Sequence, residues 1–168
     1  MDRRGPLADV VARGGAVRRA TLFVRDMARS VAFYRGVFGL EIYANRVFNV
    51  VPGGAFPAGQ AGRAGKGELT ILKGRDPLVG MIGLLSYRDP PLAEPPVSER
   101  LGRGSVVLVM QVPSAAEAAA KVAGLGGAVV MAPQHGQNTG DLDGNRIPSE
   151  VFYARDPDGH FLEVFEAT

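Results

Sequence analysis

The sequence predicts an α+β fold made of two βαβββ pseudo-repeats. Segments rich in β-forming residues alternate with amphipathic segments, and the same strand–helix pattern occurs twice. A shift of 88 residues carries Asp26 onto Ser114 and Gly39 onto Gly127, the residues expected to begin and close the two helices. Two copies indicate a duplicated domain, because solenoids need three or more repeats.

The first half begins with a predicted strand at residues 18–24. Asp26 is the predicted N-cap, since its carboxylate can accept backbone N–H groups of the next turn. Apolar residues then recur at helical spacing as far as Phe38. Gly39 is expected to end the helix in the left-handed conformation. Three further strands are predicted at residues 40–51, 68–73 and 81–87.

The second half repeats this order. A strand is predicted at residues 105–112, Ser114 is placed to cap a helix over residues 115–125, and Gly126-Gly127 closes it. The tetrapeptide Asp156-Pro157-Asp158-Gly159 is strong turn chemistry, so the last two strands are expected to form a hairpin. The three strands after the helix are predicted at residues 128–132, 149–155 and 160–166.

Glycine, proline and polar residues mark the segments between these elements. Residues 52–67 and 134–148 are predicted to be long loops, which are either functional lids or plain surface loops. The predicted division is an N-terminal tail, residues 1–16, a first βαβββ module, residues 17–88, a proline-rich linker, residues 89–103, and a second βαβββ module, residues 104–168.

The composition excludes several classes of function. Nineteen Lys and Arg residues against 17 Asp and Glu residues give a net charge of only +2, and no basic stripe is interleaved with aromatics, so we expect no nucleic-acid partner. The absence of cysteine removes disulfides, thiolate metal sites and cysteine nucleophiles, and is compatible with a reducing cytoplasm. No apolar run of about 18 residues is present, so we expect a soluble, cytoplasmic protein without a membrane partner.

Two motifs carry a resemblance to a known family. VRDMARSVAFY at residues 24–34 and DPDGHFLEV at residues 156–164 lie in this order near the two ends of the duplicated domain. Together with the duplication, they resemble the vicinal oxygen chelate superfamily, which includes glyoxalase I, bleomycin-resistance proteins and extradiol dioxygenases. The resemblance covers residues 17–167. It implies that the two halves curl into half-barrels around a cleft, which is the glyoxalase/bleomycin-resistance/dioxygenase fold.

In metal-dependent members of this family, His or Glu side chains on the first and last strands of each half hold a divalent ion. The resemblance places those four positions at Arg19, Val107, Glu163 and near Gly83, or at Leu85, which is no ligand either, if the alignment slips by two. Arginine is always protonated, and valine and glycine have no side-chain donor, so only Glu163 can bind a metal. Because a metal site needs three or more protein donors, we expect no metal and no other cofactor.

Glu163 is the centre of the predicted site. Its inward carboxylate is either a general base, an acceptor for a bound ligand or a relic, and Arg19 is its predicted ion-pair partner. His160 is expected to be a turn or surface residue, and His135 a solvated loop residue. The other predicted ligand-binding residues share the inward faces of the strands with Arg19 and Glu163: Thr21, Gln111, Phe161 and Phe165.

The leading hypothesis is a metal-independent, homodimeric member of this family that binds a small apolar or aromatic molecule in its cleft. The resemblance to bleomycin-resistance proteins implies such a sequestering role. One alternative is a metal-dependent lyase or dioxygenase that uses Glu163 together with unrecognised donors. The other is a metal-free lyase or isomerase in which Glu163 is the base.

Overall fold

The computed structural model describes residues 17–51, 64–76, 79–89, 91, 100–140 and 146–167, and its elements follow the order βαβββ twice. The first unit contains β1 (Arg19–Phe23), α2 (Met27–Phe38), β2 (Glu41–Val50), β3 (Gly65–Lys73) and β4 (Met81–Asp89). The second unit contains β5 (Val107–Gln111), α3 (Ala115–Gly124), β6 (Ala128–Gly140), β7 (Arg146–Arg155) and β8 (Phe161–Ala167).

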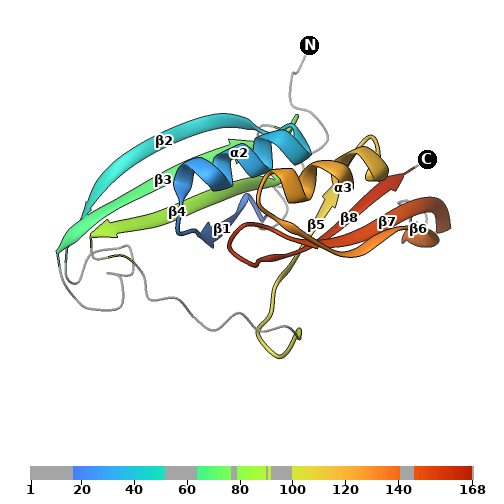
Figure 1. The fold of residues 1–168 in the computed structure, drawn as a ribbon. Coiled ribbons are helices and arrows are strands. Elements are labelled where there is room, and N and C mark those ends of the chain that lie inside the picture. The colour runs from blue at the N-terminus through green and yellow to red at the C-terminus, as the bar shows by residue number, and fades with distance from the viewer. Residues whose placement is uncertain are drawn as a thin grey trace, which may run out of the picture.

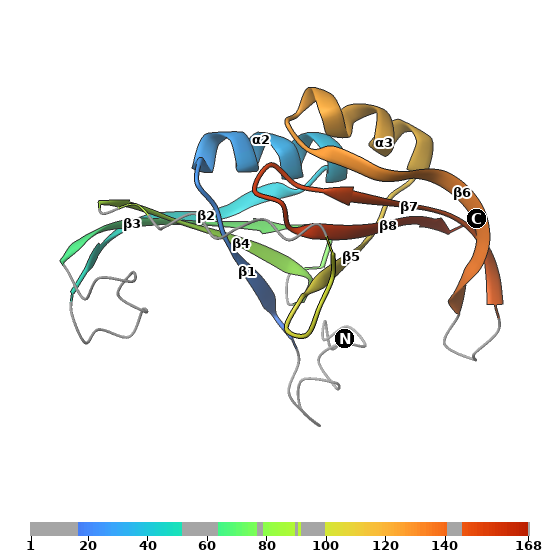
Figure 2. The ribbon, with the colours of Figure 1, turned by 60° about the horizontal axis from the view of Figure 1, so that its bottom comes forward.

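Each unit forms its own four-stranded sheet. The strand orders are β1-β4-β3-β2 and β5-β8-β7-β6, and in both sheets the first strand lies parallel to the last. The two sheets extend in opposite directions from the centre of the molecule (Figure 1), and both helices lie on the same side of them (Figure 2). The identical strand order confirms the duplication predicted from the repeated pattern.

One hydrophobic core joins the two units. Phe33 and Tyr34 of α2 are fully buried in the same cluster as Leu22 of β1 and as Phe152 and Leu162 of the second sheet. Burial of each large apolar side chain contributes about 1.5–3 kcal/mol, so the units stabilise each other through this shared core. Neither helix in the described part of the chain is long and apolar enough to cross a membrane.

Both predicted helix caps are confirmed. Asp26 Oδ1 accepts the backbone N–H of Arg29 at 3.0 Å, and Ser114 Oγ accepts that of Glu117 at 3.3 Å. Each side chain therefore satisfies a backbone donor that the first turn of a helix leaves without a partner.

The closing glycines agree with the sequence in one helix and differ by one position in the other. Gly39 follows α2 with φ 66°, as predicted. After α3 the left-handed residue is Gly126, with φ 86°, so the 88-residue shift placed this role one residue too late at Gly127. Gly127 has a steric role instead, because an added Cβ there would lie 2.5 Å from the carbonyl oxygen of Arg155.

The predicted loop at residues 134–148 is wrong over most of its length. β6 continues to Gly140 and β7 begins at Arg146, so the two strands form a long antiparallel ribbon. Main-chain hydrogen bonds hold such a ribbon whichever side chains it carries, and the register shifts within β6 weakened the alternation that would have revealed it. His135 is consequently an exposed strand residue paired with Glu150.

The other predicted irregular segments are described only in part. Residues 65–67 of the first predicted loop begin β3, whereas residues 52–63 lie outside the described residues. Asp89 ends β4 and Pro91 forms a bridge with Arg88, so the beginning of the predicted linker is ordered against the sheet. The predicted tail, residues 1–16, also lies outside the described part of the chain.

Candidate functional site

The face of each sheet that points away from the helices carries the predicted site residues, and we call it the open face. In β1, Arg19, Thr21 and Phe23 are exposed on this face, while the alternate residues pack towards α2. Thr21 pairs with Gly83 of β4. A Cβ atom at Gly83 would lie 2.9 Å from both Arg19 Cδ and Thr21 Oγ1, so these two side chains fill the space beside Gly83.

Aromatic side chains cover the next part of the open face of the first sheet. The Tyr87 ring is stacked with that of Phe23 at 6.3 Å and meets Phe48 edge-on at 6.4 Å. The Phe48 ring lies directly over Gly67, where an added Cβ would be 2.4 Å from Phe48 Cζ. Phe48 was not among the predicted site residues, and the available signal was a glycine within a strand, which often marks such a close approach.

On the open face of the second sheet, Glu163 lies between Val109 of β5 and Tyr153 of β7. Burial, the negative charge of Glu163 and a hydrogen bond to its carboxylate together raise the pKa of the Tyr153 hydroxyl. Tyr153 is also stacked on Phe161 at 5.6 Å. The half-buried carboxylate therefore accepts a hydrogen bond from Tyr153 and has aromatic and aliphatic neighbours.

The predicted ion pair between Arg19 and Glu163 is wrong. Arg19 Nε instead donates to Thr21 Oγ1 at 3.0 Å on the first sheet, while Glu163 is paired with Tyr153 on the second. The prediction failed because periodicity places each residue on a face of its own strand and says nothing about the distance between two sheets. The predicted site residues are thus divided between the sheets: Arg19 and Thr21 on the first, and Gln111, Phe161, Glu163 and Phe165 on the second.

The side chains around Glu163 do not fit a divalent metal ion. The position that corresponds to a first-strand ligand holds Val107, which pairs with Phe161, and Val109 lies beside the carboxylate. Within the described ranges, no three His, Cys, Asp or Glu side chains gather where they could share an ion. A site with one carboxylate lacks the three or more donors that a tightly bound transition metal needs.

Asp156, at the start of the β7–β8 turn, is the centre of a buried hydrogen-bond network. Its Oδ2 accepts the Tyr34 hydroxyl and His160 Nδ1, both at 2.9 Å. Its Oδ1 accepts the backbone N–H groups of Asp158 at 2.9 Å and of His160 at 2.8 Å. His160, expected to be a plain turn or surface residue, is therefore a part of this network.

Asp158 joins the same turn to the beginning of α2. Its Oδ1 accepts the backbone N–H and the Nε of Arg25, each at 3.0 Å, and its Oδ2 accepts Ser30 Oγ at 3.0 Å. We call the contacts of Asp156 and Asp158 with Arg25, Ser30 and Tyr34 the clasp. The clasp connects the two motifs that lie at opposite ends of the sequence, and it fastens the second unit to the helix of the first.

Opposing effects set the pKa values of Asp156 and of its partner His160. Burial acts to raise the pKa of Asp156, but the hydrogen bonds and charge of His160 and the Tyr34 hydroxyl outweigh it, so the pKa is lowered from 3.8. Burial acts to lower the pKa of His160, but the hydrogen bond to Asp156 and the charges of Asp156 and Asp158 raise it above 6.5.

Each of these two pKa shifts sets one limit to the pH range in which the network around Asp156 stabilises the protein. The stability from Asp156 is present above its unfolded pKa of 3.8 and is lost as the pH falls through the lower folded value. The stability from His160 is complete below 6.5 and is lost as the pH rises through the higher folded value. The clasp therefore stabilises the protein most in the mildly acidic range between these limits.

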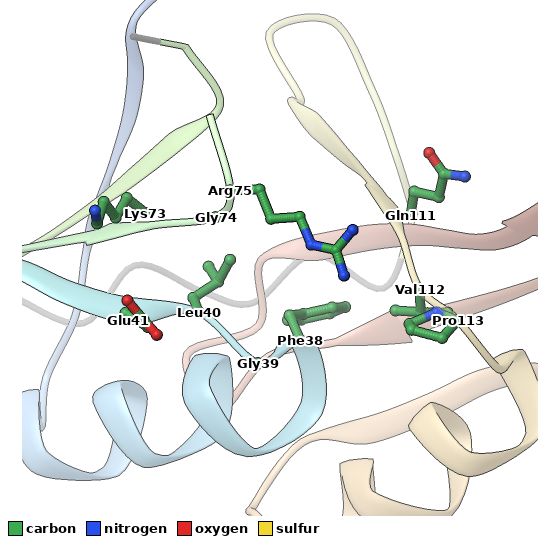
Figure 3. Close-up of a pocket in the computed structure, with 10 residues that line it drawn as sticks. All are labelled: Phe38, Gly39, Leu40, Glu41, Lys73, Gly74, Arg75, Gln111, Val112 and Pro113. Atoms are coloured by element: carbon green, nitrogen blue, oxygen red, sulfur yellow. The ribbon is translucent and has the colours of Figure 1, made fainter. Parts of the chain in front are cut away.

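A cleft of about 810 Å³ opens at the seam between the two units, away from the centre of either open face. It lies between the ends of α2 and β3 on one side and the β5–α3 junction on the other (Figure 3). Of the predicted site residues, Gln111 lines this cleft.

Several solved structures share this fold at low sequence identity. A glyoxalase family protein from Bacillus cereus is 15% identical, with a TM-score of 0.64 over 99% of this chain and 98% of that chain. A glyoxalase I variant from Zea mays is 16% identical, with a TM-score of 0.56 over 94% of this chain and 48% of that chain. The trypanothione-dependent glyoxalase I of Leishmania major is 15% identical, with a TM-score of 0.53 over 91% of this chain and 87% of that chain.

These likenesses establish the fold and leave the activity open, because one fold can carry many chemistries. A search of curated protein sequences finds no match. A family model matches residues 16–164, which includes both motifs and nearly all of both units. The chain therefore belongs to the Glyoxalase/Bleomycin resistance protein/Dioxygenase superfamily.

Proposed function

We propose that the protein binds a small apolar or aromatic molecule on the open faces of its sheets without the help of a metal ion. The observation that carries this proposal is the half-buried carboxylate of Glu163 beside the rings of Tyr153 and Phe161 and the aliphatic Val109 on the open face of the second sheet. Tyr153 and Phe161 stack beside it. Apolar sites with a few placed polar groups are the usual design of small-molecule pockets.

In this proposal Glu163 orients the ligand by accepting a hydrogen bond from it. The carboxylate already accepts one from Tyr153, and a carboxylate has lone pairs for more. Hydrogen bonds to a charged group contribute more than those between neutral groups, so one such contact can select ligands that carry a donor. A metal-dependent lyase or dioxygenase is the less favoured candidate, because Arg19, Gly83 and Val107 offer no ligand.

We also propose that the protein is a homodimer. Phe23 is 46% exposed and Val109 is 58% exposed on the open faces of the two sheets. A second copy that covers these faces would remove the apolar side chains from water and enclose the ligand. Sedimentation velocity at micromolar concentration should give twice the 17.7 kDa mass of the chain, and a monomer would contradict the dimer.

Replacement of Glu163 by Gln should weaken the binding of 2-naphthol, an aromatic probe with one hydroxyl donor, by about tenfold, because a charged acceptor becomes neutral. Titration of the intrinsic probe fluorescence measures this change. Glu150→Gln is the matched control, since Glu150 belongs to the same sheet and alternation places it on the face opposite to Glu163. Equal affinity of wild type and Glu163→Gln would contradict the assigned role.

Two further readouts separate the alternatives. Elemental analysis of protein purified without chelators should find far less than one divalent ion per chain, and a stoichiometric, tightly bound ion would overturn metal independence. If the protein is a metal-free lyase or isomerase, Glu163→Gln would abolish turnover of a substrate whose binding is retained.

A further inference from the structure

The turn between β7 and β8 has a counterpart in the first unit, before β4. Arg75-Asp76-Pro77 precedes β4 as Arg155-Asp156-Pro157 precedes β8. Asp76 Oδ1 accepts the backbone N–H of Val79 at 3.1 Å, as Asp156 Oδ1 accepts that of Asp158 at 2.9 Å. This repeat is not apparent from the strand–helix pattern, because its shift is 80 residues, whereas that pattern repeats after 88.

The clasp cannot form at the turn that contains Asp76. The shift of 88 residues carries the three donors of the clasp, Arg25, Ser30 and Tyr34, onto residues without side-chain donors: Pro113, Ala118 and Val122. Proline also lacks the backbone N–H that Arg25 donates to Asp158. The β7–β8 turn is fastened to α2. Gly74 and Arg75, at the beginning of the counterpart turn, instead face the β5–α3 junction across the cleft at the seam.

The walls of this cleft combine a cation with an apolar surface. Arg75 extends from the end of β3 towards the Gln111–Pro113 segment and lies above Phe38 (Figure 3). Leu40, Val112 and Pro113 supply the rest of the apolar lining. At about 810 Å³, the cleft has the size of an ordinary small-molecule pocket.

Arg75 is a cation of the lining that a ligand can reach. It is exposed and makes no ion pair with any carboxylate of the described residues. Its counterpart Arg155 is held in place, because Nη1 donates to Gly159 O at 2.8 Å and the guanidinium lies over the Phe161 ring at 5.5 Å. Arginine in a partly enclosed cleft is suited to bind a carboxylate through two parallel N–H groups.

The other charged groups near the cleft do not alter this assignment. Lys73 and Glu41 line it as a cross-strand pair of opposite charge, with Lys73 Nζ 5.8 Å from the centre of the Tyr43 ring. The N-terminus of α3 is already occupied, because Glu166 Oε2 accepts the backbone N–H of Ala115 at 2.8 Å. The described lining therefore has a net positive charge, which Arg75 provides.

We propose that this cleft is a second ligand site, separate from the open faces, for a small organic carboxylate. Arg75 binds the carboxylate, and the apolar part of the ligand lies against Phe38, Val112 and Pro113. The site exists because the duplicated turn kept its arginine while the donors opposite it were replaced by apolar residues. It does not depend on the ligand proposed for the open faces.

Titration with benzoate, followed by the backbone amide resonances of ¹⁵N-labelled protein, tests this site. Benzoate should shift the amides of Gly39, Gly74 and Val112, which line the cleft. Arg75→Gln should weaken benzoate binding by about tenfold or more, because the charge-assisted contact is lost. Arg35→Gln is the matched control, since Arg35 is an exposed arginine of α2 outside the cleft lining.

Benzamide, the neutral analogue of benzoate, should bind to the wild type more weakly than benzoate does. To Arg75→Gln, benzamide and benzoate should bind with equal affinity. Three results would overturn the proposal: no shifts at about 10 mM benzoate, equal benzoate affinity of Arg75→Gln and wild type, or shifts confined to the amides around Val109 and Glu163. The last result would place the carboxylate on the open face and leave the proposed main site intact.

Discussion

Replacement of Asp156 by Asn should lower the free energy of unfolding by about 3 kcal/mol, because it removes a buried carboxylate whose two oxygens both accept hydrogen bonds. All four hydrogen bonds to this carboxylate come from donors: the Tyr34 hydroxyl, His160 Nδ1 and two backbone N–H groups. An amide at this position has only one acceptor oxygen, so its NH₂ group must face two of these donors in either orientation. Urea denaturation at pH 6 measures the loss.

Two variants serve as controls for this result. Tyr34→Phe removes one of the four hydrogen bonds and leaves the carboxylate paired, so it should cost about 1 kcal/mol. Asp89→Asn changes an exposed residue at the end of β4 and should lie within about 0.5 kcal/mol of wild type. A cost for Asp156→Asn no larger than that for Tyr34→Phe would contradict the central position assigned to Asp156.

The pH dependence of stability identifies the same network independently. Wild-type stability should decline as the pH falls below 3.8 towards the lower pKa of folded Asp156, and as it rises above 6.5 towards the higher pKa of folded His160. Asp156→Asn should remove the acid limit, because the carboxylate is gone, and should weaken the alkaline limit, because His160 then keeps only the charge of Asp158. A purely steric effect of the substitution would lower stability equally at every pH.

The clasp explains why two short motifs identify the fold better than they identify the chemistry. Arg25, Ser30 and Tyr34 of the first motif bind Asp156 and Asp158 of the second, so each motif contributes one half of a structural contact. Such residues must change together if the two units are to remain packed. The positions that would hold a metal, in contrast, are free to change without loss of the fold.

Local rules predicted those parts of the fold that local interactions determine. Asp26 and Ser114 could be recognised as caps because each satisfies a donor three residues away. The extension of β6 to Gly140 could not be recognised, because cross-strand pairing with β7 stabilises it and its own sequence is polar.

For the candidate site, the sequence predicted which face of its sheet each residue occupies, but not its neighbours on other strands. Alternation placed Thr21 with Arg19 and Gln111 with Glu163 on the correct faces of their sheets. It could not reveal that Tyr153 is the partner of Glu163, because a cross-strand neighbour depends on register. Nor could it find the clasp, whose partners are 122 to 133 residues apart in the chain.

Replacement of Gly127 by Ala should also cost about 3 kcal/mol, for a steric reason. A Cβ atom there would lie 2.5 Å from the carbonyl oxygen of Arg155, 2.7 Å from Phe33 Cε2 and 3.0 Å from Val122 Cγ1. Arg155 belongs to β7 and is paired on both sides, with Ala128 and Phe161, so its backbone cannot move without disturbing the sheet. Overpacking of a well-packed core costs about 1–3 kcal/mol and more when backbone must shift.

Gly124→Ala is the matched control for this prediction, three residues earlier in the same segment. An added Cβ at Gly124 meets nothing within 4 Å, and its φ is not positive, so alanine should stabilise the end of α3 by up to about 0.5 kcal/mol. The two substitutions are chemically identical, so opposite signs in thermal denaturation would attribute the cost at Gly127 to its contact with Arg155. A neutral Gly127→Ala would instead mean that α3 and the second sheet can separate by several tenths of an ångström without loss of stability, contrary to a tightly packed shared core.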